Sequence, residues 1–158
     1  MKKSFKYLIF IYILSVLRIF PNYLSFFNLF ISKYKAWFYT ADSNLDWGED
    51  LKGVSKFLKK RGNPPVYLSY FGTSSPDYYG IKYIDLYSVS YVKRLWRFPK
   101  VKEKPEYLAV SLTNLAGVYY RNKDIFKSLK EIKPDFIIGR SIFVYDLRKL
   151  NIFVDKRG

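Results

Sequence analysis

The fold is decided by residues 46–72, whose sequence is DWGEDLKGVSKFLKKRGNPPVYLSYFG. Asp46, followed three residues later by Glu49, forms a capping-box pattern and predicts that a helix begins there. Apolar residues at helical spacing continue the pattern at Leu51, Val54 and Leu58. Gly62 and the prolines after it end the helix, and the aromatic and aliphatic residues 66–71 predict a strand. A helix that leads directly into a strand is typical of an α/β domain.

The rest of the chain continues this alternation. Strands are predicted at 83–89 and 107–112, a helix at 125–132, and a final strand or strand pair at 136–138 and 141–147. Residues 37–40 predict a short strand before the first helix of the domain, and the basic residues 93–104 predict an exposed loop. This order predicts a small three-layer α/β domain of sheet and helices over residues 36–158.

Composition excludes several classes of enzyme. The chain has 158 residues, enough for one domain with a sizeable core, and it contains no cysteine and no histidine. A disulfide framework, a thiol nucleophile, a histidine-dependent triad and Cys- or His-ligated metal sites are therefore excluded. The formal net charge of +15 favours anionic partners, namely lipid headgroups, phosphorylated substrates or nucleic acid.

Residues 1–35 have the pattern of a membrane anchor helix followed by an interfacial segment. Basic residues flank the apolar run 7–17, a second aromatic run follows, and no acidic residue precedes Asp42. The lysines at the start of the chain predict a cytoplasmic N-terminus. We therefore expect a single-pass protein of the cell (inner) membrane with an extracytoplasmic domain. A cleaved signal peptide and a buried core helix are the alternatives, although the sequence has no A-x-A cleavage site nearby.

An acidic turn precedes the helix and provides candidate ligand-binding residues. Asp42, Asn44 and Asp46 match the first three ligand positions of a calcium loop, but Trp47 and Gly53 occupy its glycine and glutamate positions, so an EF-hand is rejected. Helix capping explains Asp46 and its acidic neighbours in the first turn. It leaves Asp42 and Asn44 unexplained, so this turn is a candidate for contact with a ligand.

The segment after the strand at 66–71 is a second candidate. Thr73 and two serines lie just past the end of that strand, where α/β sheets bind ligands, and Tyr78 and Tyr79 follow. Hydroxyl groups beside aromatic rings suit a sugar, whose apolar C–H surface can stack on the rings. The alternative is an ordinary turn with the tyrosines packed back on the domain. The sequence contains none of the common phosphate-binding or nucleophile motifs.

A third candidate is the basic, aromatic stretch 93–102. Its mixture of cations and aromatic rings is typical of single-strand nucleic-acid binders and of segments that lie on anionic membranes. No recognisable nucleic-acid-binding motif accompanies it, so nucleic acid is not an expected partner. A solvated basic loop is the favoured interpretation.

Several segments together resemble a known family. They are residues 21–28 (PNYLSFFN), 42–51 (DSNLDWGEDL), 70–73 (YFGT) with Pro76, Tyr78, Tyr79 and Gly80, 111–119 (SLTNLAGVY) and 139–145 (GRSIFVY). They resemble the C-terminal extracytoplasmic region of bacterial GT-C-type membrane glycosyltransferases, the dolichyl-phosphate-mannose-protein mannosyltransferase-like proteins. The likeness covers most of the chain, although Glu49 stands where the family usually has Gln and a Gly-Gly pair near residue 30 is missing.

The resemblance implies a membrane-tethered domain that takes part in sugar transfer from a polyprenyl-phosphate donor. The family's catalytic carboxylate lies in its first extracytoplasmic loop, whereas this chain begins at what looks like the last span. We therefore expect an accessory or detached C-terminal domain that is not catalytic alone, with no cofactor. The expected partners are membrane lipid, a multi-spanning glycosyltransferase subunit, and a polyprenyl-phosphate sugar or glycan acceptor. The expected ligand-binding residues are Asp42, Asn44, Asp46, Trp47, Thr73, Tyr78 and Tyr79, with no catalytic residue and no metal site. The alternative is a basic membrane-surface binding module with no role in sugar transfer.

Overall fold

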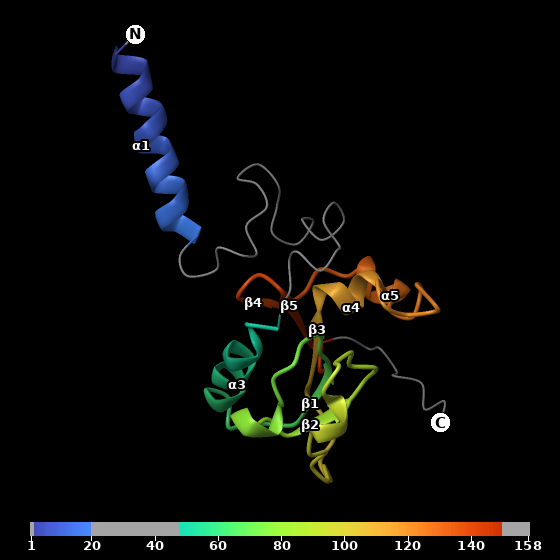
Figure 1. Cartoon of the computed structure of the whole chain (residues 1–158). Coiled ribbons are helices and arrows are strands. Elements are labelled where there is room, and N and C mark those ends of the chain that lie inside the picture. The colour runs from blue at the N-terminus through green and yellow to red at the C-terminus, as the bar shows by residue number, and fades with distance from the viewer. Residues whose placement is uncertain (1, 20–47, 150–158) are drawn as a thin grey trace.

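The computed structural model describes residues 2–19 and 48–149, and Figure 1 shows the arrangement of their helices and strands. The helices are α1 (Lys2–Ile19), α3 (Leu51–Lys59), α4 (Leu112–Ala116) and α5 (Lys127–Lys130), with short 3-10 turns η1 (Asp77–Tyr79) and η2 (Lys93–Leu95). The strands are β1 (Val66–Ser69), β2 (Tyr83–Asp85), β3 (Tyr107–Ser111), β4 (Phe136–Ile138) and β5 (Ile142–Asp146).

The strands form one five-stranded mixed sheet in the order β2-β1-β3-β5-β4. Strands β2, β1 and β3 are parallel, β5 is antiparallel to β3, and β4 pairs with β5 as an antiparallel hairpin. All three parallel strands therefore end at one side of the sheet, which we call the carboxyl edge, and begin at the opposite side, the amino edge. The carboxyl edge is where open α/β sheets place their ligands.

Helices lie on both faces of the sheet, as Figure 1 shows. Alternate side chains of a strand point to opposite faces, so Leu68 and Ala109 pack with α3 while Leu108 and Val110 pack with α4 and α5. The predicted mixed α/β class is therefore confirmed. The buried face of α3 consists of Leu51, Val54, Ser55, Phe57 and Leu58, which includes the apolar stripe seen in the sequence.

Several predicted boundaries are wrong. Helix α3 begins at Leu51, and its N-cap is Asp50, whose side chain makes no capping bond. The predicted capping box fails because Gly48 has a φ of +82°, a left-handed conformation that a helix cannot include. The strands predicted at 66–71 and 83–89 are shorter, and only one isolated bridge, between Phe71 and Val89, extends their edge of the sheet. The helix predicted at 125–132 is reduced to α5.

Helix α1 forms where the anchor helix is predicted. Its apolar side chains are exposed around the helix, and the large ones are Phe5, Tyr7, Leu8, Ile9, Phe10, Ile11, Tyr12, Ile13, Leu14 and Leu17. Within residues 2–19 and 48–149, however, no helix reaches the combination of length and apolarity that crossing a membrane requires. The predicted interfacial segment, the strand at 37–40 and the acidic turn all lie outside the described residues.

Candidate functional site

Two stretches that the sequence analysis singled out converge at the carboxyl edge. The hydroxyl of Tyr70 donates a hydrogen bond of 2.8 Å to the carbonyl oxygen of Gly48. A Cβ atom on Gly48 would lie 2.9 Å from the Cα of Gly72, which is closer than real side chains approach. Both positions therefore require glycine. Gly48 follows Trp47 and Gly72 precedes Thr73, so the chain brings the ends of both predicted ligand segments to one place.

A chain of hydrogen bonds that is buried at one end and exposed at the other lies at the same edge, on the face covered by α4. The side-chain amide of Asn114 donates to the hydroxyl of Ser69 at 3.1 Å, and this hydroxyl is 3.2 Å from that of Tyr120. Tyr120 donates its own proton to the carbonyl oxygen of Tyr87 at 2.5 Å. Because a phenol has a single proton, Ser69 must donate to Tyr120, and the direction of the whole chain is fixed.

Burial raises the pKa of the Tyr120 phenol to about 12, partly opposed by the Ser69 hydrogen bond. The phenol is therefore neutral at ordinary pH and remains a donor to Tyr87. Tyr87 has a φ of +57°, a conformation that is strained for a bulky side chain. Such strain is frequent where the surrounding structure holds a functional segment in place.

Two oxygen atoms beside this chain have no hydrogen-bond partner among the described residues. They are the Thr113 hydroxyl oxygen and the Asn114 side-chain carbonyl oxygen, and both residues are only 1% exposed. Buried polar atoms in native proteins are almost always hydrogen-bonded, and leaving one unpaired costs about 1–3 kcal/mol. Buried side-chain atoms of Asn63, Asp85 and Trp96 also lack a partner among the described residues, but Thr113 and Asn114 place two such oxygens on neighbouring residues, which makes this place a candidate for accepting hydrogen bonds.

An aromatic pair borders the polar chain. The rings of Phe71 and Tyr119 are stacked, with centroids 5.2 Å apart and an interplanar angle of 5°. Phe71 is buried, whereas Tyr119 is 47% exposed. The Tyr119 ring is therefore backed by Phe71 and partly accessible to solvent. An aromatic face beside neutral hydroxyl and amide groups suits binding of a polyhydroxylated ligand.

Asp50 has a structural role at this edge. Its buried carboxylate accepts hydrogen bonds from the backbone N–H groups of Arg140 and Ser141 and from the Ser141 hydroxyl, at 2.8–3.1 Å. Gly139 permits this approach, because a Cβ atom there would collide with the carboxylate. Asp50 therefore ties the start of α3 to the turn between β4 and β5. No group of three or more acidic residues that could hold a metal ion occurs in the described part of the chain.

The remaining predicted residues do not all meet at this site. Thr73 is exposed and follows Gly72 at the carboxyl edge. Tyr79 packs in the core on the α3 face, where its carbonyl accepts a 2.7 Å bond from Ser55, and Tyr78 makes an edge-on ring contact with it. These tyrosines therefore lie on the opposite face of the sheet from Tyr120. Asp42, Asn44, Asp46 and Trp47 lie outside the described residues.

The stretch 93–102 is not simply a solvated loop. Trp96 is only 5% exposed and packs with its ring centroid 5.8 Å from that of Tyr70, and the ammonium of Lys93 is 2.7 Å from the Asp85 carboxylate. The prediction of an exposed loop is therefore wrong for these two residues, because a core position and an ion pair hold them in place. Arg94 and Arg97 remain exposed.

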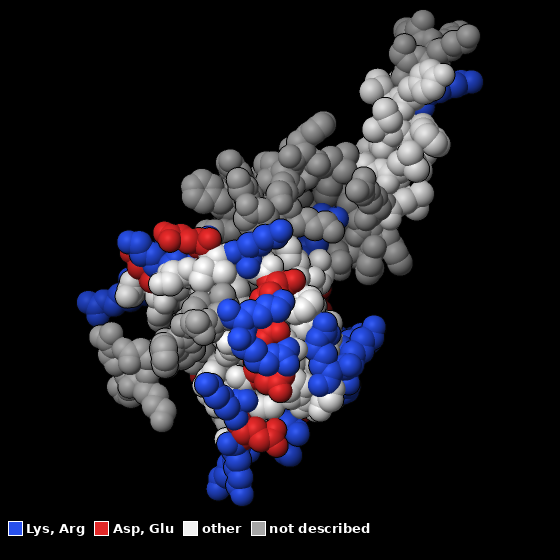
Figure 2. All heavy atoms as spheres, turned by 180° about the vertical axis from the view of Figure 1, so that it is seen from behind, with Lys and Arg blue, Asp and Glu red and all other residues white. Residues whose placement is uncertain are grey.

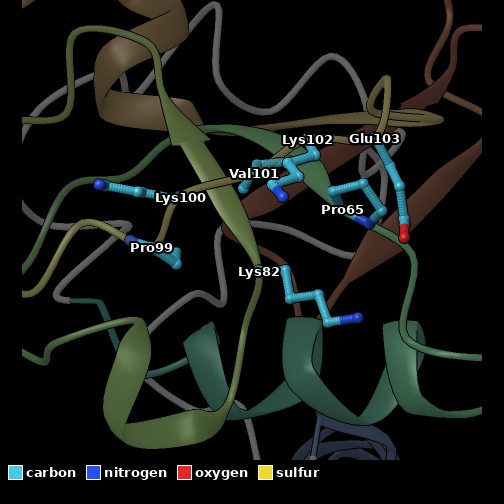
Figure 3. Close-up of a pocket in the computed structure, with 7 residues that line it drawn as sticks. All are labelled: Pro65, Lys82, Pro99, Lys100, Val101, Lys102 and Glu103. Atoms are coloured by element: carbon cyan, nitrogen blue, oxygen red, sulfur yellow. The ribbon is translucent and has the colours of Figure 1, made fainter.

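An open pocket of about 220 Å³ lies at the amino edge, far along the strands from the polar chain. Pro65 and Lys82, which come shortly before β1 and β2, line it together with residues 99–103. In Figure 3 the side chains of Lys82 and Lys100 point in different directions instead of toward a common centre. This pocket therefore lacks the converging groups of a specific anion site.

Sequence reasoning missed most of the buried polar chain. It also missed the residues beside this chain, namely Thr113, Tyr119 and Ser111, whose hydroxyl accepts a 3.0 Å bond from the backbone N–H of Phe71. The available signal was that Ser69 and Ser111 are polar residues at the ends of apolar strands.

Comparison of the chain with protein-family models, curated proteins and solved structures finds no match. The resemblance to membrane glycosyltransferases therefore stays a prediction.

Proposed function

We propose that this protein is a membrane-associated accessory or detached C-terminal domain of a polyprenyl-phosphate-sugar-dependent glycosyltransferase, and that it binds a sugar at the carboxyl edge without catalysing transfer alone. The observation that carries the proposal is the pair of unsatisfied oxygens on Thr113 and Asn114 beside the exposed ring of Tyr119. In the proposal the Tyr119 ring covers a sugar's C–H face, and the sugar's hydroxyls donate to these oxygens, which are buried in this structure, when local opening of the edge exposes them.

The groups at the edge favour binding over catalysis. Asp50, the buried acid of the described edge, is occupied by three hydrogen bonds, and the Tyr120 phenol is held neutral by its raised pKa. Neither is suited to moving a proton at neutral pH. Asp42 and Asp46 are the acids of the sequence that lead into this edge, and in the proposal they contact the sugar or the phosphate-linked donor through hydrogen bonds.

The membrane part of the proposal rests on α1. A helix that is apolar around its whole circumference is stable only when that surface is covered, either by lipid or by other helices. The lysines at its start favour the headgroup region. In the proposal, α1 lies against the bilayer or a multi-spanning partner subunit and keeps the α/β domain near a lipid-linked sugar.

Calorimetry of the detergent-solubilised full chain with a short-chain polyprenyl-phosphate sugar, and with glycan acceptors, tests this function. We expect Thr113→Val and Tyr119→Ala each to weaken binding about fivefold, since each removes one contact worth about 1 kcal/mol. Asp42→Ala should also weaken it. Phe98→Ala, which removes a half-exposed ring beside Tyr83 at the start of β2, is the matched control. Equal affinity of all variants, or no binding to any of these ligands, would reject the proposed site.

Gentle extraction of the tagged chain from its native membrane tests the accessory role. Co-purification of a multi-spanning protein with an acidic first outer loop is the expected result. Recovery of the folded chain alone would favour the alternative, a basic membrane-surface module with no role in sugar transfer.

A further inference from the structure

The solvent face of α3 is made of lysine. In this helix every exposed residue is a lysine, namely Lys52, Lys56 and Lys59, and the exposed Lys60 follows directly. At 100° per residue these four positions fall within about 100° of the helix circumference and extend along about 12 Å. We call them the α3 lysine face. Figure 2, seen from behind, shows basic side chains gathered at the side of the domain where α3 lies, beside a strip in which acidic and basic side chains alternate.

Helix stability does not explain this arrangement. The last-turn lysines interact favourably with the helix dipole, but Lys52 lies in the first turn, where a positive charge is unfavourable. Lysines four residues apart, such as Lys52 and Lys56, also repel each other by a few tenths of a kcal/mol. Among the described ion pairs none includes a lysine of this face. The face therefore carries a concentrated charge that lacks a counterpart within the described domain.

An exposed aromatic ring lies in a turn that packs along α3. The 3-10 turn η1 packs along α3 through the bond from Ser55 to the Tyr79 carbonyl, and Tyr78 in this turn is 83% exposed. The nearby acid, Asp77, already accepts hydrogen bonds from Ser75 and from the backbone N–H of Arg97, so it is oriented into the turn. A tyrosine at the margin of a basic face is the combination found at membrane–water interfaces.

We propose that the α3 lysine face, with Tyr78 at its margin, docks the domain onto the anionic headgroups of the membrane in which α1 is held. A membrane is favoured over nucleic acid because α1 exposes a long apolar surface on the same chain. The inference uses the membrane association of α1 but not the sugar site. The proposal fixes the orientation of the domain. If the α3 lysine face rests on the bilayer, the opposite face of the sheet, which carries Tyr120, is directed away from the membrane.

Vesicle flotation of the full chain tests this orientation. Vesicles of phosphatidylcholine alone measure the contribution of α1, and vesicles with about 30 mol% phosphatidylglycerol add negative charge. Each lysine near an anionic surface strengthens binding about fivefold, so we expect K52Q/K56Q/K59Q/K60Q to lose at least about thirtyfold in affinity for the anionic vesicles. Its affinity for neutral vesicles should not change. The four Lys→Arg substitutions should restore binding, and about 0.5 M salt should abolish the difference.

The matched control removes four exposed cations from other parts of the surface. K104Q/R121Q/K127Q/K133Q changes the net charge equally, and these residues lie outside α3. It should lose less than about threefold, since only general attraction is reduced. Equal losses in both variants would show that net charge, not this face, binds the lipid. Lysine-dependent binding to a single-stranded oligonucleotide at least as tight as to the vesicles would also overturn the proposal. Glycan calorimetry on the same variants keeps this failure separate from a failure of the proposed sugar site.

Discussion

The amino edge of the sheet and the α4 face of its carboxyl edge use polar residues in different ways. At the amino edge, charged side chains pair with one another: Arg148 contacts Asp146 at 2.8 Å and Glu106 at 3.0 Å, and Lys149 contacts Asp135 at 2.9 Å. On the α4 face of the carboxyl edge, neutral side chains form a directed chain of hydrogen bonds from the Asn114 amide through Ser69 and Tyr120 to the Tyr87 carbonyl. The unsatisfied oxygens of Thr113 and Asn114 lie beside it.

This difference separates a structural edge from a candidate binding edge. Ion pairs whose cations are more than half exposed close the amino edge, and water screens them on the side of the cation. Buried unsatisfied oxygens lower stability and persist only where another advantage offsets the cost. Function is therefore expected at the carboxyl edge, where unsatisfied oxygens lower the stability of the domain. Mutations at each edge test this expectation.

The largest effect is expected at Asp50. Asp50→Ala removes three hydrogen bonds to a buried carboxylate and leaves the backbone N–H groups of Arg140 and Ser141 without their partner. We expect the free energy of unfolding to fall by about 3 kcal/mol or more. Urea unfolding followed by circular dichroism measures it. Asp124→Ala, at an exposed position, should change it by no more than about 0.5 kcal/mol. Similar values for both variants would show that Asp50 is not the tie between α3 and the β4–β5 turn.

The second prediction compares two buried hydroxyls at the carboxyl edge. Ser111→Ala leaves the Phe71 N–H without its acceptor and should destabilise the domain by about 1–3 kcal/mol. Thr113→Val removes a hydroxyl that lacks a partner, in a side chain of similar shape, and should leave stability unchanged or raise it by up to about 1 kcal/mol. Thermal unfolding of both variants provides the measurement. A destabilisation by Thr113→Val as large as that by Ser111→Ala would mean that Thr113 is satisfied in the folded chain and would weaken the candidate site.

The core of this architecture could be predicted from the sequence, because local patterns determine it. The apolar runs of β1, β3 and β5 are buried from end to end apart from Tyr67, and the stripe of α3 has an unmistakable helical period. The start of α3 could not be predicted. Gly48 is held in its left-handed conformation by a long-range approach to Gly72, and no local pattern reports such a contact.

The candidate site was only partly predictable for the same reason. Ser69 and Asn114 are 45 residues apart, and their contact follows from the pairing of β1 with β3. Tyr78 and Tyr79 follow Thr73 closely in the sequence, which suggested one site, but η1 turns them toward α3. Trp96 looked exposed because cations surround it in the sequence, yet it fills the core beside Tyr70.

The third prediction concerns alkaline pH. Burial raises the pKa values of Tyr120 and Tyr83 to about 12, whereas the unfolded chain has the ordinary value of 10. Above pH 10 the unfolded state loses protons that the folded state retains, so stability that is fully present below pH 10 falls as the pH rises toward 12. Urea midpoints across this window should decline, and Tyr120→Phe and Tyr83→Phe should each flatten the decline. Because one tyrosine lies at each edge, an unchanged slope in only one variant would show which of the two phenols is not held neutral by burial.

The smallest effect is expected at Arg148, and it bears most directly on the comparison. Its guanidinium bonds Asp146, Glu106 and the Tyr107 hydroxyl, a network that looks as extensive as that of Asp50. Arg148 is more than half exposed, however, so in Arg148→Met water replaces the guanidinium, and the buried Asp146 carboxylate keeps its hydrogen bond from the backbone N–H of Arg148. We expect a small loss of stability at low salt that vanishes at about 0.5 M salt, measured by urea unfolding. A large, salt-independent loss would show that polar contacts at the amino edge also stabilise the fold strongly. The way polar groups are satisfied would then no longer distinguish the carboxyl edge as the binding edge.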